Sequence, residues 1–275
     1  MKKIITKQKL VLLVCLSAGF SFAQQTLKGQ LVDEQTKEPV EFANMGIIGK
    51  GIGTVTDEKG MFALSVPDSL VGEKLRVSRI GYKTRELGVK EVEKQLVLYL
   101  AQASTNLNEV AVSAKKLKIK VVGNDTKTRS VTAGFTKNNL GAELAVKLNI
   151  KNPNTQLRRF FINIASNAID TPLFRLNVYN LDKHGKPNEN ILQHNILFQP
   201  KEKTGLVELD LIPYNIYVNE DVFIAIEWVK DLGDVKGLSF SSKLIGSQTY
   251  YRQASQDKWE KLPSVGIGLH AEIGY

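Results

Sequence analysis

Short runs of alternating apolar and polar residues or of β-branched residues make up the chain from residue 27 to about residue 100, and this pattern predicts β-strands. Turn-forming residues separate runs at 27–32, 42–48, 53–56, 61–64, 75–78 and 95–100. Asp57 and Gly60 frame a four-residue turn, so we expect a hairpin between 53–56 and 61–64. Many short strands without helical periodicity indicate a small β-sandwich.

The second half repeats this pattern after a polar, lysine-rich segment at 104–128, which we interpret as a linker or a loose edge. Apolar residues alternate in 142–150 and 174–179, and 160–164 is apolar except for Asn163, as in a deeply buried strand. Residues 249–252 and 259–262 predict a last hairpin. Seven or eight such strands over 129–275 predict a second β-sandwich, of jelly-roll type. The fold class is therefore all-β, with two sandwich domains.

One alternative architecture concerns the C-terminal end. In residues 267–275 apolar and other residues alternate up to an aromatic residue at the end, as in the last strand of outer-membrane barrels. About 160 residues suffice for a barrel of eight strands. However, 160–162 does not alternate, and most strands are shorter than the roughly ten residues that a barrel strand needs. We therefore favour the sandwich.

The first twenty-three residues predict a removable export signal. A head with four lysines precedes an apolar run at 10–20 and a small-residue cleavage site at 21–23. Val14 before Cys15 does not fit a lipoprotein signal, so we expect Cys15 to leave with the segment. The exported chain, 24–275, would then contain no cysteine and would work in the periplasm, at the outer membrane or at the cell surface.

Removal of the predicted signal lowers the net positive charge of the chain. The full chain has 37 basic and 28 acidic residues, and four of the basic ones belong to the signal. The remaining excess is small, spread thinly and not interleaved with aromatic residues, which argues against nucleic acid as a partner.

Four segments of the first domain resemble the carboxypeptidase-regulatory-like domain. They are 29–33, 38–43, 53–62 and 77–82, in the family's order, and 107–112 resembles the segment that closes this domain in exported Gram-negative envelope proteins. The resemblance implies a seven-stranded, transthyretin-like sandwich over 24–103, as found before the plug of many TonB-dependent receptors. The second domain resembles, more weakly, the accessory jelly-roll domains of secreted envelope proteins, which implies no defined ligand.

The family's name does not predict peptidase activity here. A metallocarboxypeptidase needs two histidines and a carboxylate on zinc, and His184, His194 and His270 lack any such spacing. Turn chemistry accounts for Asp57 and Gly60 better than a calcium site. We predict no catalytic residues, no metal and no cofactor. The carboxylates Asp170, Asp210, Glu227 and Asp234 leave open a hydrolase whose site forms only in three dimensions.

The candidate ligand contacts are Tyr250, Tyr251 and Trp259, whose rings could stack on a sugar or a peptide across the last hairpin. Cross-strand packing of the same rings is the alternative. The glycine-rich run 46–53 predicts a flexible connection between strands. Together these features predict an exported, non-catalytic binding or scaffolding protein of the cell envelope, which recognises a glycan, peptide or protein partner through its C-terminal sandwich.

Overall fold

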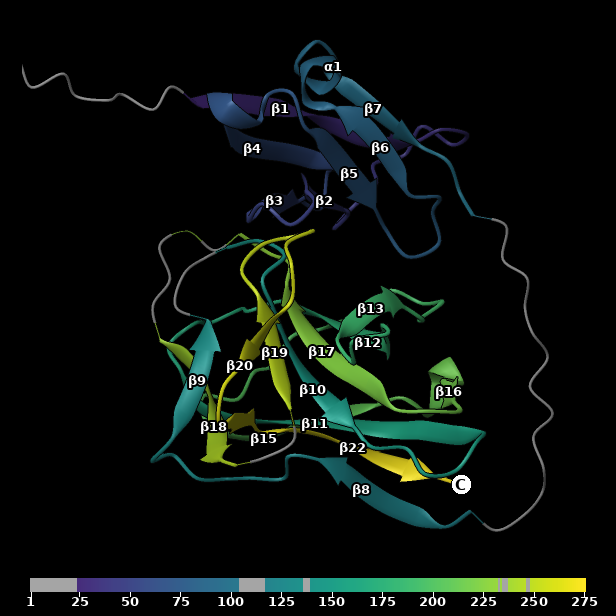
Figure 1. Cartoon of the computed structure of the whole chain (residues 1–275), viewed down its shortest axis with the longest axis vertical. Coiled ribbons are helices and arrows are strands. Elements are labelled where there is room, and N and C mark those ends of the chain that lie inside the picture. Colours follow the sequence, from purple (N-terminus) through teal and green to yellow (C-terminus); the bar gives the residue numbers. More distant parts are fainter. Residues whose placement is uncertain (1–23, 104–116, 136–138, 232, 234–236, 246–247) are drawn as a thin grey trace, which may run out of the picture.

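The computed structural model describes residues 24–103, 117–135, 139–231, 233, 237–245 and 248–275 (Figure 1). The predicted signal with Cys15 and the closing segment 107–112 lie outside these residues. The described chain is almost entirely β, which confirms the predicted fold class, and its strands form two pairs of sheets. No helix in this part of the chain is long and apolar enough to cross a membrane.

The first domain contains seven strands in two sheets. One sheet has the order β4-β1-β7 and the other β3-β2-β5-β6. The strands are β1 (Gln24–Asp33), β2 (Asn44–Ile47), β3 (Ile52–Val55), β4 (Met61–Pro67), β5 (Lys74–Ser78), β6 (Arg85–Gly88) and β7 (Val97–Leu100), with a short helix α1 (Val89–Glu93) and a 3₁₀ turn η1 (Asp68–Leu70). Alternate residues of both sheets, such as Leu31, Met45 and Leu75, fill a common core.

The predicted hairpin between β3 and β4 is wrong, although its turn is present. β3 pairs with β2 and β4 pairs with β1, so the chain crosses from one sheet to the other at this turn. The fully buried Thr56 explains why pairing stops there. Its hydroxyl accepts a hydrogen bond from the Ala43 amide and donates one to the Val40 carbonyl, which fixes the end of β3 beside the β1–β2 connection.

The crossing turn itself has the chemistry that the sequence predicted. The Asp57 carboxylate accepts hydrogen bonds from the Lys59 and Met61 amides at 2.8 Å, and Gly60 has φ +70°. We expect Asp57→Ala to lower the free energy of unfolding by about 1 kcal/mol, because two backbone bonds to a carboxylate are lost. Chemical denaturation measures this, and EDTA should leave the melting temperature of the unmodified protein unchanged. A drop with EDTA would indicate a calcium site instead.

The second domain is formed by a seven-stranded and an eight-stranded sheet. The first has the order β13-β12-β17-β10-β19-β20, with β14 beside β12. Its strands are β10 (Glu143–Leu148), β12 (Phe174–Leu181), β13 (Pro187–Asn190), β14 (Ile196–Phe198), β17 (Val222–Trp228), β19 (Thr249–Arg252) and β20 (Glu260–Leu262). β19 pairs with β20, which confirms the predicted last hairpin.

The eight-stranded sheet has the order β21-β18-β11-β22-β8 and places the C-terminal strand between two others. β15 and β16 pair with β11, and β9 pairs with β18. Its strands are β8 (Ile119–Gly123), β9 (Thr132–Phe135), β11 (Thr155–Asn167), β15 (Gly205–Asp210), β16 (Tyr217–Val218), β18 (Leu238–Leu244), β21 (Val265–Ile267) and β22 (Leu269–Gly274), and a 3₁₀ turn η2 (Ile212–Tyr214) follows β15. Residues 160–164, which are apolar except for the buried Asn163, lie in β11 at the centre of this sheet. An aromatic cluster between the two sheets includes Phe174, Trp228 and Phe240.

The two domains dock closely, with β2 and β3 of the first above the loop between β19 and β20 of the second (Figure 1). A small apolar cluster joins Phe42 and Val55 to Val229. The Asp257 carboxylate accepts the Gly51 amide at 2.9 Å, and the Gln256 carbonyl accepts the Gly49 amide at 2.9 Å. The interface therefore combines apolar packing with backbone hydrogen bonds.

Glycines make this close approach possible. A Cβ at Gly46 would lie 2.3 Å from the carbonyl oxygen of Ser255, and one at Gly53 would lie 2.1 Å from it. Neither is a flexible connection, since Gly46 lies within β2 and Gly53 within β3. The predicted flexibility of 46–53 is wrong for these two positions, because they allow the backbone of the second domain to pack directly on the strands.

Candidate functional site between the two domains

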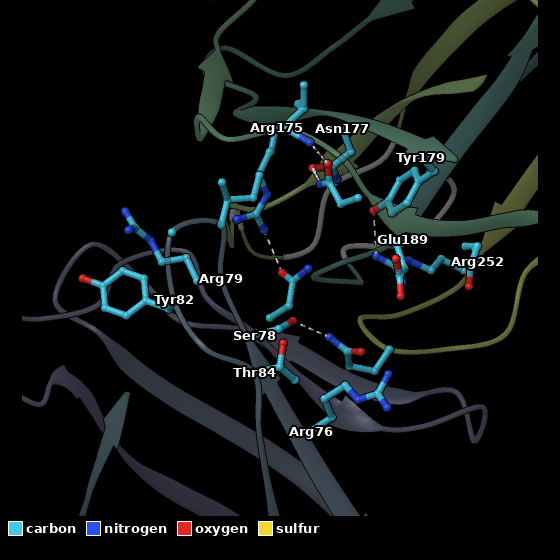
Figure 2. A pocket seen from close by; sticks show the side chains of 17 residues that line it. Arg76, Ser78, Arg79, Tyr82, Thr84, Arg175, Asn177, Tyr179, Glu189 and Arg252 are labelled. Carbon is cyan, nitrogen blue, oxygen red and sulfur yellow. Dashed lines mark hydrogen bonds between the residues drawn. The ribbon is translucent and has the colours of Figure 1, made fainter. Parts of the chain in front are cut away.

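A cavity with a volume of about 610 Å³ lies between the domains (Figure 2). One wall comes from β2, β5 and the β5–β6 loop, and it includes Asn44, Arg76, Ser78, Arg79, Tyr82 and Thr84. The facing wall comes from β12, β13 and the β19–β20 hairpin, and it includes Arg175, Asn177, Tyr179, Asn188, Asn190 and Arg252. Most of these side chains are polar.

Behind this wall a row of four charged residues crosses four neighbouring strands of the seven-stranded sheet. Arg175 on β12 is the register partner of Glu227 on β17, which faces Glu143 on β10, which in turn faces Arg252 on β19. We call Arg175, Glu227, Glu143 and Arg252 the charged row. Both glutamates are 0% exposed and Arg175 is 2% exposed. A fold tolerates four buried charged side chains only when each of them is paired with an opposite charge and its polar atoms are hydrogen-bonded.

Arg175 joins the two domains through its guanidinium. Its Nε and Nη2 donate to the two Glu227 oxygens at 2.8 and 3.0 Å. The remaining donors cross the interface, with Nη1 to the Phe42 carbonyl at 2.6 Å and Nη2 to the Asn44 side-chain oxygen at 2.7 Å. The planar fork of arginine supplies these bonds at once, which lysine could not do.

Glu143 forms the other end of the row with Arg252 and Tyr179. The Arg252 Nε donates to Glu143 at 3.0 Å, and its Nη2 bonds the same oxygen. The Tyr179 hydroxyl donates to Glu143 Oε2 at 2.9 Å. The Arg252 guanidinium also lies 4.9 Å from the centre of the Trp259 ring, a cation–π contact. This end of the row faces the cavity through Arg252 and Tyr179.

The two carboxylates converge on one amide. The Asn177 side chain donates to Glu227 Oε2 at 2.8 Å and to Glu143 Oε2 at 3.3 Å. Its own oxygen accepts a bond from Asn190 Nδ2 at 2.8 Å, which connects the row to β13 at the cavity rim. The row is therefore a single hydrogen-bonded network that reaches the cavity at Asn177 and Asn190.

The two buried glutamates differ in protonation. Burial raises the pKa of Glu143 to about 7, against the opposing charge of Arg252 and with added repulsion from Glu227. Burial also opposes the ionisation of Glu227, yet the charge of Arg175 and its hydrogen bonds outweigh it and leave the Glu227 pKa below its ordinary value. The pKa values of two glutamates on adjacent strands are thus displaced in opposite directions.

This difference predicts a pH dependence of stability. Glu143 binds its proton more tightly when folded, about 7 against an ordinary 4.5, so its contribution is complete below pH 4.5 and is lost as the pH rises through 7. We expect the unfolding free energy of Glu143→Gln to fall less between pH 5 and 7 than that of the unmodified protein, measured by urea denaturation at each pH. His270, whose pKa is lowered by burial, has the opposite sign but is present in both proteins.

A matched control for this measurement is Glu86→Gln, because Glu86 forms an exposed pair with Arg76 in the other domain. Its pH profile should parallel that of the unmodified protein. If the profile of Glu143→Gln is also parallel between pH 5 and 8, Glu143 does not titrate in this window.

The three aromatic residues singled out in the sequence do not line the cavity between the domains. Tyr250 is buried against Phe223, with ring centres 5.3 Å apart. Tyr251 donates its hydroxyl to Glu260 at 2.7 Å and borders a smaller cavity of about 270 Å³. Trp259 packs edge-on against Tyr179 at 5.4 Å. Tyr250 and Trp259 are thus held by ring contacts and Tyr251 by its hydrogen bond, and the role of all three as ligand contacts stays a prediction.

The other candidate residues are dispersed. Among the acids, Asp170 pairs with Lys203 at the surface and Asp210 caps a turn, while Asp234 lies outside the described residues. His184 and His194 are exposed, and the buried His270 stacks on Phe161 with ring centres 4.9 Å apart. The described residues contain no group of three or more His, Cys, Asp or Glu side chains that could hold a metal ion.

Sequence reasoning missed most of the site. It named Glu227 but not Glu143, Arg175 or Arg252, because their register pairs join strands that are far apart in the chain. One signal was available: Ala145, Phe223 and Ala225 occupy the face of β10 and β17 opposite to the sandwich core. Apolar residues on both faces of a strand indicate that both faces are covered.

Comparisons with known proteins concern the first domain. Residues 27–112 match the family model of the CarboxypepD_reg-like domain, which agrees with the resemblance found in the sequence. The chain is similar to the TonB-dependent receptor SusC of Bacteroides thetaiotaomicron, with 41% identity over 93 residues. These residues are 34% of this chain and 9% of the receptor, so the chain spans less than a tenth of that relative.

Among solved structures, the infectious bursal disease virus VP2 subviral particle aligns with 91% of this chain and 63% of its own, at 8% identity and a TM-score of 0.24. The structure of the same virus, Gx strain, aligns at 9% identity with a TM-score of 0.23, over 91% of this chain and 63% of its own. Scores this low do not establish a common fold.

Proposed function

We propose that this chain is an exported, non-catalytic binding protein of the cell envelope, and that its ligand occupies the cavity between the two domains. Similarity of the first domain to part of a TonB-dependent receptor supports an envelope location. The matched family is a regulatory type of domain, which supports a binding or docking role rather than a catalytic one. The predicted export signal agrees with both.

The observation that carries this proposal is the cavity itself. Its volume of about 610 Å³ lies within the usual range for small-molecule sites, and such sites occur preferentially at domain interfaces. Polar groups from both domains converge on it. The sequence placed recognition in the C-terminal sandwich alone, whereas this geometry assigns one wall to each domain.

The docking of the domains supports a preformed site. Arg175, the Gly49–Gln256 backbone bond and the Ser78–Gln256 side-chain bond of 2.9 Å all span the interface beside the cavity. A ligand that meets two walls already in place loses less binding free energy to ordering than one that must bring them together. The first domain then acts as half of the recognition surface rather than as a spacer.

A cavity-filling variant tests the proposal. Thr84 lines the cavity and is exposed, so Thr84→Trp should fill space without disturbing the core. The tagged chain without its predicted signal is applied to arrays of defined glycans and of synthetic peptides. Probes that bind the unmodified chain should fail to bind Thr84→Trp.

The matched control is Thr26→Trp, which adds the same ring at an exposed threonine on β1, outside the cavity. It should bind as the unmodified chain does. Binding that survives Thr84→Trp would place the ligand elsewhere and refute the proposed site.

A hydrolase is the second candidate, and one observation favours it. Glu143 and Glu227 are adjacent carboxylates whose pKa values are displaced in opposite directions, as in acid–base pairs. Against it, both are 0% exposed and their oxygens bond Arg175, Asn177, Tyr179 and Arg252. To distinguish a hydrolase from a binding protein, each bound probe is incubated with the chain and then analysed by mass spectrometry. Cleavage of the probe that Glu143→Gln abolishes without loss of binding would establish the hydrolase.

A further inference from the structure

Each arginine that lines the cavity between the domains forms an ion pair with a carboxylate. Each has a carboxylate partner that does not itself line the cavity: Glu86 for Arg76, Glu41 for Arg79, Glu227 for Arg175 and Glu143 for Arg252. Glu189 is the one acidic side chain among the described lining residues. The Arg175 donors are taken up by Glu227, Phe42 and Asn44, so the walls offer the Nη1 donors of Arg76, Arg79 and Arg252. These donors lie in a nearly neutral field, which gives an anionic ligand little net attraction.

The remaining lining groups both donate and accept hydrogen bonds. They are the amides of Asn44, Asn188, Asn190 and Gln256, with the hydroxyls of Ser78, Thr84 and Tyr82. The Asn177 amide and the Tyr179 hydroxyl also line the cavity, but they bond the buried glutamates. An amide presents two donor hydrogens and an acceptor oxygen, and a hydroxyl presents one donor and two acceptor sites. A ligand that matches these walls must itself carry many groups of mixed donor and acceptor character.

Apolar side chains are scarce in the same walls. The aliphatic members are Ile80 and Leu192, and the Tyr82 ring adds one aromatic surface, which has the Arg79 guanidinium 5.3 Å from its centre. A bound peptide takes its specificity from pockets for its side chains. The described cavity offers little to such side chains.

We infer that the cavity selects an uncharged, polyhydroxylated ligand, namely a neutral oligosaccharide, over anions and peptides. This inference rests on the proposed binding site and adds the class of ligand. Sugar hydroxyls donate and accept, as these walls require, and the planar amide and guanidinium groups can each bond two neighbouring hydroxyls. Tyr82 supplies an apolar surface for the C–H face of a sugar ring.

Salt dependence tests the charge of the ligand directly. Titration calorimetry compares a neutral oligosaccharide identified on the array with its sulfated or carboxylated counterpart of the same backbone, at 50 and 500 mM NaCl. The dissociation constant of the neutral sugar should change by less than about twofold between these salt concentrations. The charged counterpart should bind no more tightly than the neutral sugar.

A matched pair of variants tests the wall. Arg76 lines the cavity and pairs with Glu86 through Nε and Nη2, whereas Arg85 forms a similarly exposed pair with Glu91 outside the cavity. Arg76→Ala should weaken binding of the neutral oligosaccharide about fivefold, the equivalent of one hydrogen bond. Arg85→Ala should leave it unchanged, and both variants should retain the melting temperature of the unmodified chain within a few degrees.

The outcomes separate this inference from the proposed function. The ligand class would be overturned if the charged sugar bound more tightly and lost affinity steeply with added salt, or if only peptides bound. If Thr84→Trp then abolished the binding of that charged sugar or peptide, the proposed site would still be upheld. Binding that Thr84→Trp leaves intact refutes both. Absence of binding by every neutral glycan on the array also overturns the inference.

Discussion

Arg175→Ala is expected to lower the free energy of unfolding by about 3–5 kcal/mol, the cost of leaving a buried charge without its partner. Glu227 would remain on β17, 0% exposed, with Asn177 as its remaining donor. The Phe42 carbonyl and the Asn44 side chain would lose their bonds across the interface. Urea denaturation followed by tryptophan fluorescence measures the loss, and Trp228 in the core of the same sheet reports on it.

A second variant separates the charge from the contact. In Arg175→Met with Glu227→Leu, no charge is left unpaired, so we expect the stability of the second domain to recover in large part. The bonds to Phe42 and Asn44 stay lost, so docking of the first domain should remain weaker. A single Arg175→Ala protein as stable as the unmodified chain would mean that Glu227 is protonated or solvated and that the charged row does not hold the fold together.

The strands of this fold could be predicted from sequence, but their partners could not. The alternation in 142–150 locates β10 correctly and implies that Glu143 faces solvent. In the structure Glu143 is buried, because Tyr179 and Arg252 bond it and Trp259 of the β19–β20 loop packs on both of these side chains. The alternation of apolar and polar residues identifies which residues of a strand share a face of the sheet. It does not show what covers that face.

The charged row shows the same limit at the site. Arg175, Glu227, Glu143 and Arg252 belong to four strands, and their alignment depends on the register of three pairings. The four strands β10, β12, β17 and β19 are distant from one another in sequence, so no local spacing brings the four residues together. Asp57 and Gly60 were predictable for the opposite reason, because a turn uses the hydrogen bonds of its own residues.

Gly53→Ala is expected to separate the two domains while leaving each folded. The new Cβ would lie 2.1 Å from the Ser255 carbonyl oxygen and 2.9 Å from the backbone carbon and nitrogen of the same residue, closer than real Cβ contacts. Backbone atoms in a docked loop cannot rotate away as a side chain can. Overpacking of this kind costs about 1–3 kcal/mol, and separation of the domains is the simplest way to relieve it.

Small-angle scattering and circular dichroism measure the two effects separately. The radius of gyration of Gly53→Ala should increase while its far-ultraviolet spectrum stays that of a folded β protein, and probes of the cavity should no longer bind. Gly72→Ala is the matched control in the same domain, because a Cβ there meets nothing within 4 Å. Because Gly53 has no positive φ, alanine is acceptable to its backbone, and any difference between the two variants arises from contact with the second domain. Equal radii of gyration and equal stabilities in the two variants would show that Ser255 can move aside, and the glycines of β2 and β3 would then not be required for docking.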